Sequence, residues 1–214
     1  MEYPTIIPVF PLPNVVLFPG VPLPLHIFEP RYRDLVRDAS ASYEIIGISL
    51  LRGDWKARYH ENPDIFETGC AGKIVSLEQL PDGKYNILLH GVREFVIERH
   101  IFDKSYRQAA IRWRTLGPRG IEHACRTRLI SLLSSFLRTQ PNTPAHRLLH
   151  DRTLSDHLLV NFFSYALDIA PLEKQDLLEA ASLSDRAERL REILEFHLEE
   201  ARLGPKPPGP DRCH

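Results

Sequence analysis

The feature that most constrains this chain is the spacing of its prolines between residues 8 and 32, in the stretch PVFPLPNVVLFPGVPLPLHIFEPRY. Each proline fixes its own φ angle, lacks a backbone N–H and holds the preceding residue in extended geometry. The apolar runs between the prolines are therefore too short and too interrupted for helices. We expect closely spaced strands there, followed by an amphipathic helix that begins at Pro30 and carries Leu35, Val36 and Ala39 on its apolar face.

Strand signals continue to about residue 118. The isoleucine-rich run at 44–51 has the length and composition of a buried strand. The sequence Pro81-Asp82-Gly83 has the residues of a hairpin turn between two further strands, and Gly69 and Gly72 mark a bulge or a close approach of backbones. Several strands at short spacing indicate a curled antiparallel sheet or a barrel, and the spacing alone leaves both open.

The second part of the chain has a different apolar period. Beyond Leu-Gly-Pro-Arg-Gly at 116–120 the period changes from two residues to about 3.6. Apolar stripes predict helices over 121–137, 154–167, 171–180 and 184–201, the last with Ser184 as its N-cap. We therefore divide the chain into a β domain (1–118), a C-terminal helical region (119–203) and a proline-rich tail (204–214) that we expect to be disordered.

Two segments resemble the Lon protease N-terminal substrate-binding domain, in a stand-alone form. They are PVFPLPNVVLFPGVPLPLHIFEPRYRDLV and TGCAGKIVSLEQLPDGKYNILLHGVREF, and the helical segment from Leu154 to Leu194 is similar to the helical part of that family. The resemblance implies an α+β fold in which a PUA-like antiparallel β pseudobarrel precedes a C-terminal α-helical bundle. One position departs from the family pattern, because Glu94 stands where a second basic residue is often found.

Composition and charge exclude some classes of protein. The chain has 27 Lys and Arg against 28 Asp and Glu, evenly shared by its two parts, so it lacks the basic excess typical of proteins that bind a phosphate backbone. In the basic segment 107–128, Arg107, Arg112 and Arg114 provide either an anionic contact or a solvated strand face. The sequence has no apolar run of about 18 residues and no signal-like N-terminus, so we expect a cytoplasmic protein outside the membrane.

The sequence predicts no enzymatic activity, metal or cofactor. The HRLLH sequence at 146–150 lacks the glutamate of HExxH, which favours solvated histidines. The two Gly-Lys pairs lack the other residues of a phosphate loop. The resemblance therefore implies the recognition part of Lon without its ATPase and protease. Widely spaced cysteines without a CxxC pair indicate reduced thiols, the first two of them buried: Cys70, Cys125 and Cys213.

Our first hypothesis is a non-enzymatic module that binds unfolded polypeptides or a partner protein, in proteolysis or protein quality control. In this hypothesis, apolar residues of the proline-rich loops contact apolar segments of the bound chain, while an extended peptide pairs with a sheet edge. The alternative for the same side chains is that they fill the core. The residues concerned are Val15, Leu17, Phe18 and Val21.

Two other functions remain open from the sequence. One is RNA binding, because PUA-like barrels also occur in RNA-binding proteins and the segment 107–128 is basic; the balanced charge makes nucleic acid the weaker candidate partner. The other is an unrecognised hydrolase or peptidase, which only the family name suggests. The sequence sets no oligomeric state.

Overall fold

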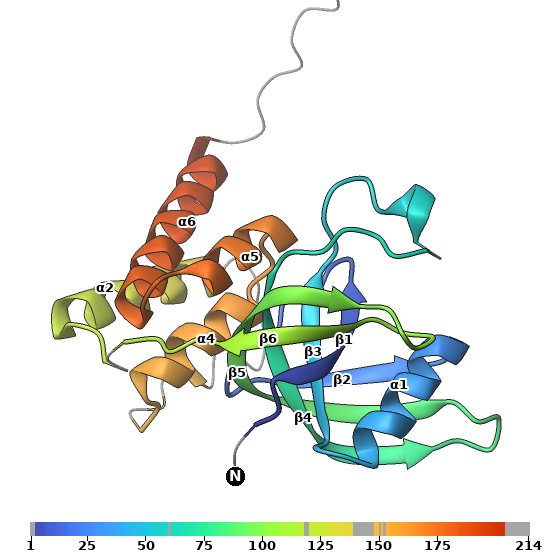
Figure 1. Cartoon of the computed structure of the whole chain (residues 1–214). Helices are drawn as coiled ribbons and strands as arrows, with labels where there is room; N and C mark the ends of the chain where they lie inside the picture. Colours follow the sequence, from blue (N-terminus) through green and yellow to red (C-terminus); the bar gives the residue numbers. More distant parts are fainter. Residues whose placement is uncertain are drawn as a thin grey trace, which may run out of the picture.

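The computed structural model describes residues 3–59, 61–117, 120–138, 148–149, 151 and 153–203. A curled sheet of six strands lies beside a group of helices, which gives the expected α+β architecture (Figure 1). The strands are β1 (Ile6–Leu12), β2 (Pro22–Ile27), β3 (Ile45–Leu50), β4 (Thr68–Gln79), β5 (Tyr85–Ile101) and β6 (Gln108–Trp113). The helices are α1 (Pro30–Ser40), α2 (His123–Leu137), α4 (Asp156–Ala166), α5 (Pro171–Glu179) and α6 (Leu183–Leu203).

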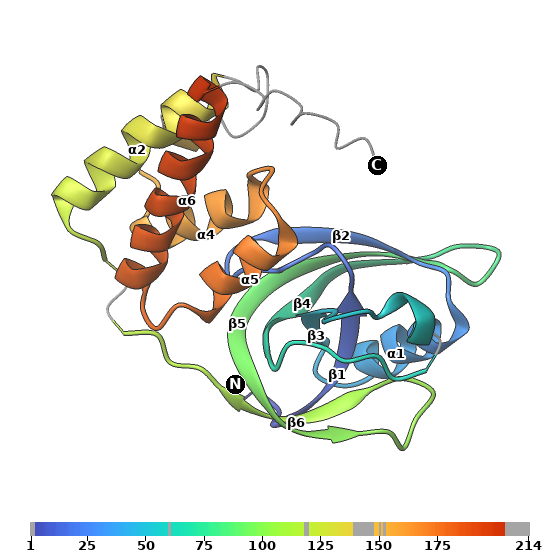
Figure 2. The same ribbon diagram turned by 90° about the horizontal axis from the view of Figure 1, so that it is seen from above.

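The sheet curls back on itself. Its strand order is β2-β5-β4-β3-β1-β6, and β5 also pairs with β6, so five of the strands follow one another in a ring (Figure 2). Every pairing is antiparallel except that of β1 with β3, which is parallel with Val9 opposite Gly47. The sheet is therefore mixed rather than wholly antiparallel. The chain makes the parallel pair because β2 and α1 provide the long crossover that parallel neighbours require.

Strand β5 connects the sheet with the proline-rich loop. It has 17 residues and bends where its pairing register with β4 shifts, next to Gly72. At Gly91 the loop before β2 crosses the strand so closely that a Cβ atom would lie 2.1 Å from the carbonyl oxygen of Phe18. The close approach predicted at Gly69 is also confirmed, since a Cβ atom there would lie 2.5 Å from the carbonyl oxygen of Ile48.

Two further local predictions are confirmed. Strand β3 is buried at each of its residues. The hairpin between β4 and β5 closes with a hydrogen bond of 2.8 Å from the Leu80 N–H to the Lys84 carbonyl, and Gly83 has a φ of +79°. A positive φ is the conformation that favours glycine at this position of the turn.

The predicted helices are present, but the cap of α6 is two residues earlier than predicted. The hydroxyl of Ser182 accepts a hydrogen bond of 3.0 Å from the Asp185 N–H, and the Asp185 carboxylate accepts one of 2.8 Å from the Ala181 N–H. Ser184 lies inside the first turn. The prediction of Ser184 as N-cap is therefore wrong, because Ser182 and Asp185 form the reciprocal pair that satisfies the free N–H groups.

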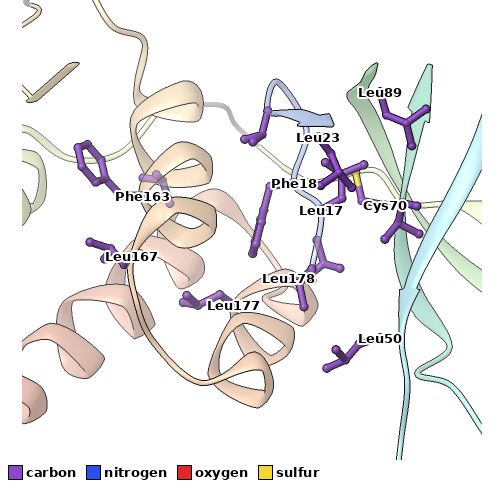
Figure 3. Close-up of a cluster of buried hydrophobic side chains, with 14 of the residues drawn as sticks. Leu17, Phe18, Leu23, Leu50, Cys70, Leu89, Phe163, Leu167, Leu177 and Leu178 are labelled. Atoms are coloured by element: carbon purple, nitrogen blue, oxygen red, sulfur yellow. The ribbon is translucent and has the colours of Figure 1, made fainter. Parts of the chain in front are cut away.

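One hydrophobic core cluster extends from the sheet into the helices. Leu17, Phe18 and Cys70 on the sheet side meet Leu177 and Leu178 of α5 (Figure 3). A second cluster fills the interior of the curled sheet. The shared cluster indicates that the sheet and the helices pack as one unit. The domain boundary at residue 118 and the disordered tail at 204–214 concern residues outside the described ranges, so both stay predictions. Within those ranges, no helix combines the length and apolarity of a membrane span.

Candidate functional site

A cleft of about 630 Å³ opens where the helices meet the curled sheet. Its walls come from the loop before β2, the middle of β5, the segment after β6 and the beginnings of α4 and α6. This volume is within the range of pockets that bind small molecules or short peptide segments. We call it the junction cleft, and its residues include Gly20, Gly91, Arg93, Glu94, Arg114 and Leu183.

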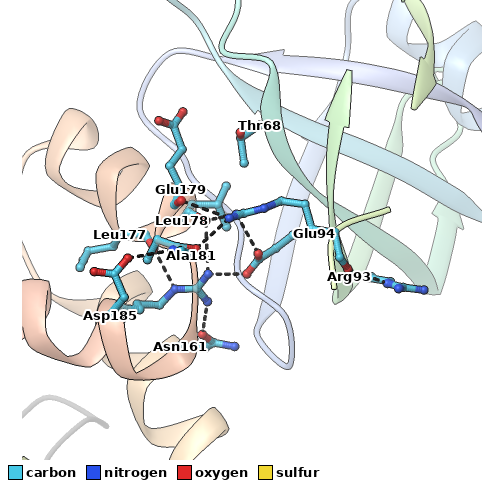
Figure 4. A network of polar contacts seen from close by, with 12 residues as sticks. Thr68, Arg93, Glu94, Asn161, Leu177, Leu178, Glu179, Ala181 and Asp185 are labelled. Atoms are coloured by element: carbon cyan, nitrogen blue, oxygen red, sulfur yellow. Dashed lines mark hydrogen bonds and ion pairs between the residues drawn. The ribbon is translucent and has the colours of Figure 1, made fainter. Parts of the chain in front are cut away.

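A buried ion pair joins Glu94, which lines the junction cleft, to Arg186, which lies outside its lining. Glu94 on β5 is 2% exposed and Arg186 on α6 is 0% exposed, and 2.5 Å separates the Glu94 Oε1 and Arg186 Nη2 atoms (Figure 4). Arg186 also donates from Nε to the Leu177 carbonyl at 2.8 Å and from Nη1 to the Asn161 Oδ1 atom at 2.5 Å. Because a buried charge is stable only when it is paired and hydrogen-bonded, these contacts hold β5, α4, α5 and α6 in one arrangement.

Arg114 completes this network from the end of β6. Its Nη1 atom donates to Glu94 Oε2 at 3.1 Å and to the Leu178 carbonyl at 2.7 Å, and its Nη2 atom donates to the carbonyls of Glu179 and Ala180 at 3.1 and 2.7 Å. Free carbonyls at the C-terminus of a helix carry partial negative charge. Arg114 therefore caps the C-terminus of α5 and also pairs with Glu94.

The apolar residues predicted to bind peptides lie mainly in the core. Leu17, Phe18 and Val21 are each 0% exposed, and Val15 is half-buried against the same core cluster. The Phe18 ring lies 5.3 Å from the guanidinium carbon of Arg186. The expectation of an exposed apolar surface is corrected for these three residues, because helices that follow much later in the chain cover the loop. The structure shows the alternative for these three residues, which is that they fill the core.

The arginines of the basic segment do not form one surface. Arg107 is 7% exposed, donates to the Pro63 carbonyl at 2.6 Å and stacks on Phe102, and its burial lowers its pKa. Arg112 is exposed and lies 3.5 Å from Glu98. Three more arginines of the segment pair with carboxylates: Arg114 with Glu94, Arg126 with Asp156 and Arg128 with Glu195. These ion pairs leave little free charge for a phosphate backbone, which weighs against RNA binding.

The described ranges contain no group of three or more His, Cys, Asp or Glu side chains placed to hold a metal ion. His146 and His150 of the HRLLH sequence lie outside those ranges, as does Cys213. Cys70 and Cys125 are free thiols, and burial raises the pKa of both. The interpretation of Cys70 as a small buried side chain is confirmed, and a thiol with a raised pKa is a poor nucleophile.

Sequence reasoning noticed Glu94 as an unusual acid but did not find its partner. A signal for the partner exists in α6, where Arg186 lies three residues after Leu183 and four before Leu190 and so occupies the apolar face of the helix. A charged residue on an apolar face indicates a buried ion pair. The sequence could not supply the other half of the pair, because Glu94 and Arg186 are 92 residues apart.

The comparisons with known proteins agree with this architecture. A family model described as the substrate-binding domain of ATP-dependent protease La (LON) matches residues 6–195. The Lon proteases of Cytophaga hutchinsonii and Parabacteroides distasonis are 28% and 29% identical over 91% of this chain. The chain spans only 24% of the length of each of these two relatives.

Solved structures show the same fold. The crystal structure of a Lon N-terminal domain protein from Xanthomonas campestris covers 90% of this chain and 98% of its own, with a TM-score of 0.64 and 23% identity. The N-terminal domain of the Mycobacterium avium complex Lon protease covers 90% and 99%, with a TM-score of 0.68 and 17% identity. Together with the match of the family model over nearly the whole sequence, these findings mean that the chain belongs to the Lon substrate-binding domain family.

Proposed function

We propose that this chain is a cytoplasmic module that binds polypeptide segments in the junction cleft and catalyses no reaction itself. The observation that carries the proposal is the cleft itself, which lies between two packed parts of a chain whose family is described as substrate-binding. In the Lon relatives this region is about a quarter of the protein. By analogy, the polypeptides bound by this chain are those that enter proteolysis or quality control.

The cleft is a better candidate than the free edge of the sheet. Strand β2 is the edge strand, and it contains Pro22 and Pro24, which have no N–H group to donate to an added strand. Prolines and short length are the usual means by which edge strands avoid pairing with other chains. A peptide bound in the cleft meets apolar side chains, such as Val92 and Leu116, and polar groups, such as Arg93 and Thr115.

Filling the cleft tests the proposal. The substitution Thr115→Trp places a large side chain at the cleft, where Thr115 is exposed, while Thr127→Trp makes the same change on the exposed surface of α2. The ligand is a reduced and alkylated protein that stays unfolded, labelled with a fluorophore, and binding is followed by fluorescence anisotropy. We expect Thr115→Trp to raise the Kd at least about tenfold, equivalent to about 1.4 kcal/mol.

The control variant Thr127→Trp should bind the unfolded protein as the wild type does. Equal affinity of both variants would place binding elsewhere on the molecule, and a wild-type protein without saturable binding would contradict the function. Both variants are first compared with the wild type by thermal unfolding, so that a loss of binding is read only from folded protein. Cell fractionation tests the cytoplasmic location separately.

A further inference from the structure

Among the described residues that line the junction cleft, two arginines face one carboxylate, since Arg93 and Arg114 are lining residues together with Glu94. Glu94 is the only carboxylate among the described residues that line it, and both of its oxygens accept hydrogen bonds from arginines, Oε1 from Arg186 and Oε2 from Arg114. Two guanidinium groups thus share one carboxylate. The carbonyls at the end of α5 offset part of the excess charge by their dipoles, but they add no formal negative charge.

Arg93 lines the same cleft, and among the described residues its hydrogen bonds go only to neutral groups. Arg93 donates from Nε to the Arg114 carbonyl at 3.1 Å and from Nη2 to the Thr115 hydroxyl at 3.2 Å, and its guanidinium lies 6.0 Å from the Trp113 ring. Among the described residues it forms no ion pair with a carboxylate. A guanidinium has five N–H donors, so the two bonds to neutral acceptors leave donors for a ligand.

The surroundings of Arg93 define what kind of anion fits. Apolar side chains form part of the lining of the cleft, namely the half-buried Val92 and Leu116 and the buried Leu183. An arginine set among apolar groups pairs with a planar carboxylate through two parallel hydrogen bonds. A long polyanion needs a series of free cations, whereas the neighbouring arginines of the basic segment are already ion-paired.

We propose that the junction cleft selects polypeptide segments in which an aspartate or glutamate side chain is flanked by apolar residues, and that Arg93 binds this carboxylate. The inference rests on the proposed function and names the class of segment that the cleft prefers. The apolar neighbours of the acidic residue contact the apolar side chains of the cleft, while its carboxylate forms an ion pair with Arg93. Selection by charge and by apolar contact together distinguishes such segments from purely apolar ones.

Two peptides of about twelve residues test the inference by fluorescence anisotropy. Both are acetylated and amidated at their ends and rich in leucine and phenylalanine, and they differ only in one central residue, Glu or Gln. We expect the wild-type protein to bind the Glu peptide about 10- to 100-fold more tightly, since a hydrogen bond to a charged group is worth more than one to a neutral group. This preference should shrink as salt is added.

Variants of β5 then assign the preference to one side chain. Arg93→Gln should remove the preference for the Glu peptide. Arg93→Lys keeps the charge but lacks the planar guanidinium that forms two parallel hydrogen bonds, so it should retain part of the preference. The matched control is Arg99→Gln, which removes the same charge from an exposed position roughly 20 Å further along the strand. Thermal unfolding of each variant shows whether the fold is intact.

The outcomes separate the inference from the proposed function. Equal binding of the two peptides by the wild type, with the unfolded protein still bound in the cleft, overturns the inference and leaves the function. The inference is also overturned if Arg93→Gln and Arg99→Gln reduce the preference for the Glu peptide equally. Displacement of the Glu peptide by an RNA oligonucleotide of low micromolar affinity likewise overturns the inference. If neither the peptides nor the unfolded protein bind, both proposals fail.

Discussion

The substitution Arg186→Met tests whether the buried network holds the helices on the sheet. Methionine has a similar length and no charge, so the change removes the guanidinium while it keeps much of the side-chain volume. In the native protein Arg186 donates hydrogen bonds to Glu94, Asn161 and the carbonyls of Leu177 and Leu178. All of these acceptors lose the hydrogen bond from Arg186 in the variant, while Glu94 and the Leu178 carbonyl keep one from Arg114.

The expected loss of stability follows from the burial of both Glu94 and Arg186. Removing one member of a buried ion pair costs about 3–5 kcal/mol, because the remaining charge stays desolvated without its partner. Arg114 still contacts the other oxygen of Glu94 at 3.1 Å and provides partial compensation. We therefore expect a decrease in the free energy of unfolding at the lower end of this range, about 3 kcal/mol. For a chain of this size, that corresponds to a decrease in Tm of about 6–12 °C.

Urea and thermal unfolding measure the effect, and two further variants define its origin. The double variant Glu94→Gln with Arg186→Met should be more stable than the sum of the single changes predicts, by about 0.5–3 kcal/mol, because neither Glu94 nor Arg186 is left as a buried charge without the other. Arg114, whose side chain is 16% exposed, loses its carboxylate partner but keeps its hydrogen bonds to the carbonyls at the end of α5. Arg112→Met is the control. Arg112 pairs with Glu98 at the surface, with side chains 63% and 56% exposed, so its loss should cost about 0–1 kcal/mol.

The reasoning is refuted if Arg186→Met stays within about 1 kcal/mol of the wild type, which is the range of a surface pair. It is also refuted if the effects of the two single changes simply add, because additivity means that Glu94 and Arg186 do not stabilise each other. A loss of stability in the single variants with a partial recovery in the double variant is the expected pattern.

Two other predictions follow from the same structure. Phe18→Ala should destabilise the protein by about 3–5 kcal/mol, since it leaves a cavity in the core, and urea unfolding measures this; loss of peptide binding at unchanged stability would contradict the core position of Phe18. The second prediction concerns acid. Hydrogen bonds from Lys104 and Tyr106 lower the pKa of Asp38, so this carboxylate stabilises the folded state above its ordinary pKa, and the contribution is lost as the pH falls through the lowered value. Unfolding curves measured at pH 7 and pH 3 should therefore show that the wild type is more stable than Asp38→Asn at pH 7 and that this difference is smaller at pH 3. A difference that does not depend on pH would contradict the stabilising role of the Asp38 carboxylate.

The parts of the fold that depend on neighbouring residues could be predicted from the sequence. The turn at Pro81-Asp82-Gly83, the buried strand β3 and the glycine-dependent contact at Gly69 follow from chemistry within a few positions of the chain. The prolines before residue 32 excluded helices until Pro30, where α1 begins. Turn geometry, strand burial and helix starts are local properties, and for this reason patterns in one sequence indicate them.

The candidate site depended on contacts that no local pattern contains. The proline-rich loop was recognised, but whether Phe18 faces water or the core was decided by helices more than a hundred residues later. The parallel pairing of β1 with β3 was likewise missed, because strand direction depends on the path of the intervening crossover. The sequence left open whether Arg114 forms an anionic contact or lies on a solvated strand face, and in the structure it pairs inside the protein with Glu94 and the end of α5.

Three features could be inferred from the order of residues alone, namely the class of the fold, the change from strands to helices after about residue 118 and the resemblance to one family. They could be inferred because periodicity, prolines and motifs are properties of the linear chain. Which charges are buried and which are available for a ligand depends on how the chain folds. Glu94 and Arg186 meet across 92 residues, and among the described residues no carboxylate pairs with Arg93 in the cleft. Burial and charge balance are properties of surfaces brought together by folding, and they exist only once the helices lie against the sheet.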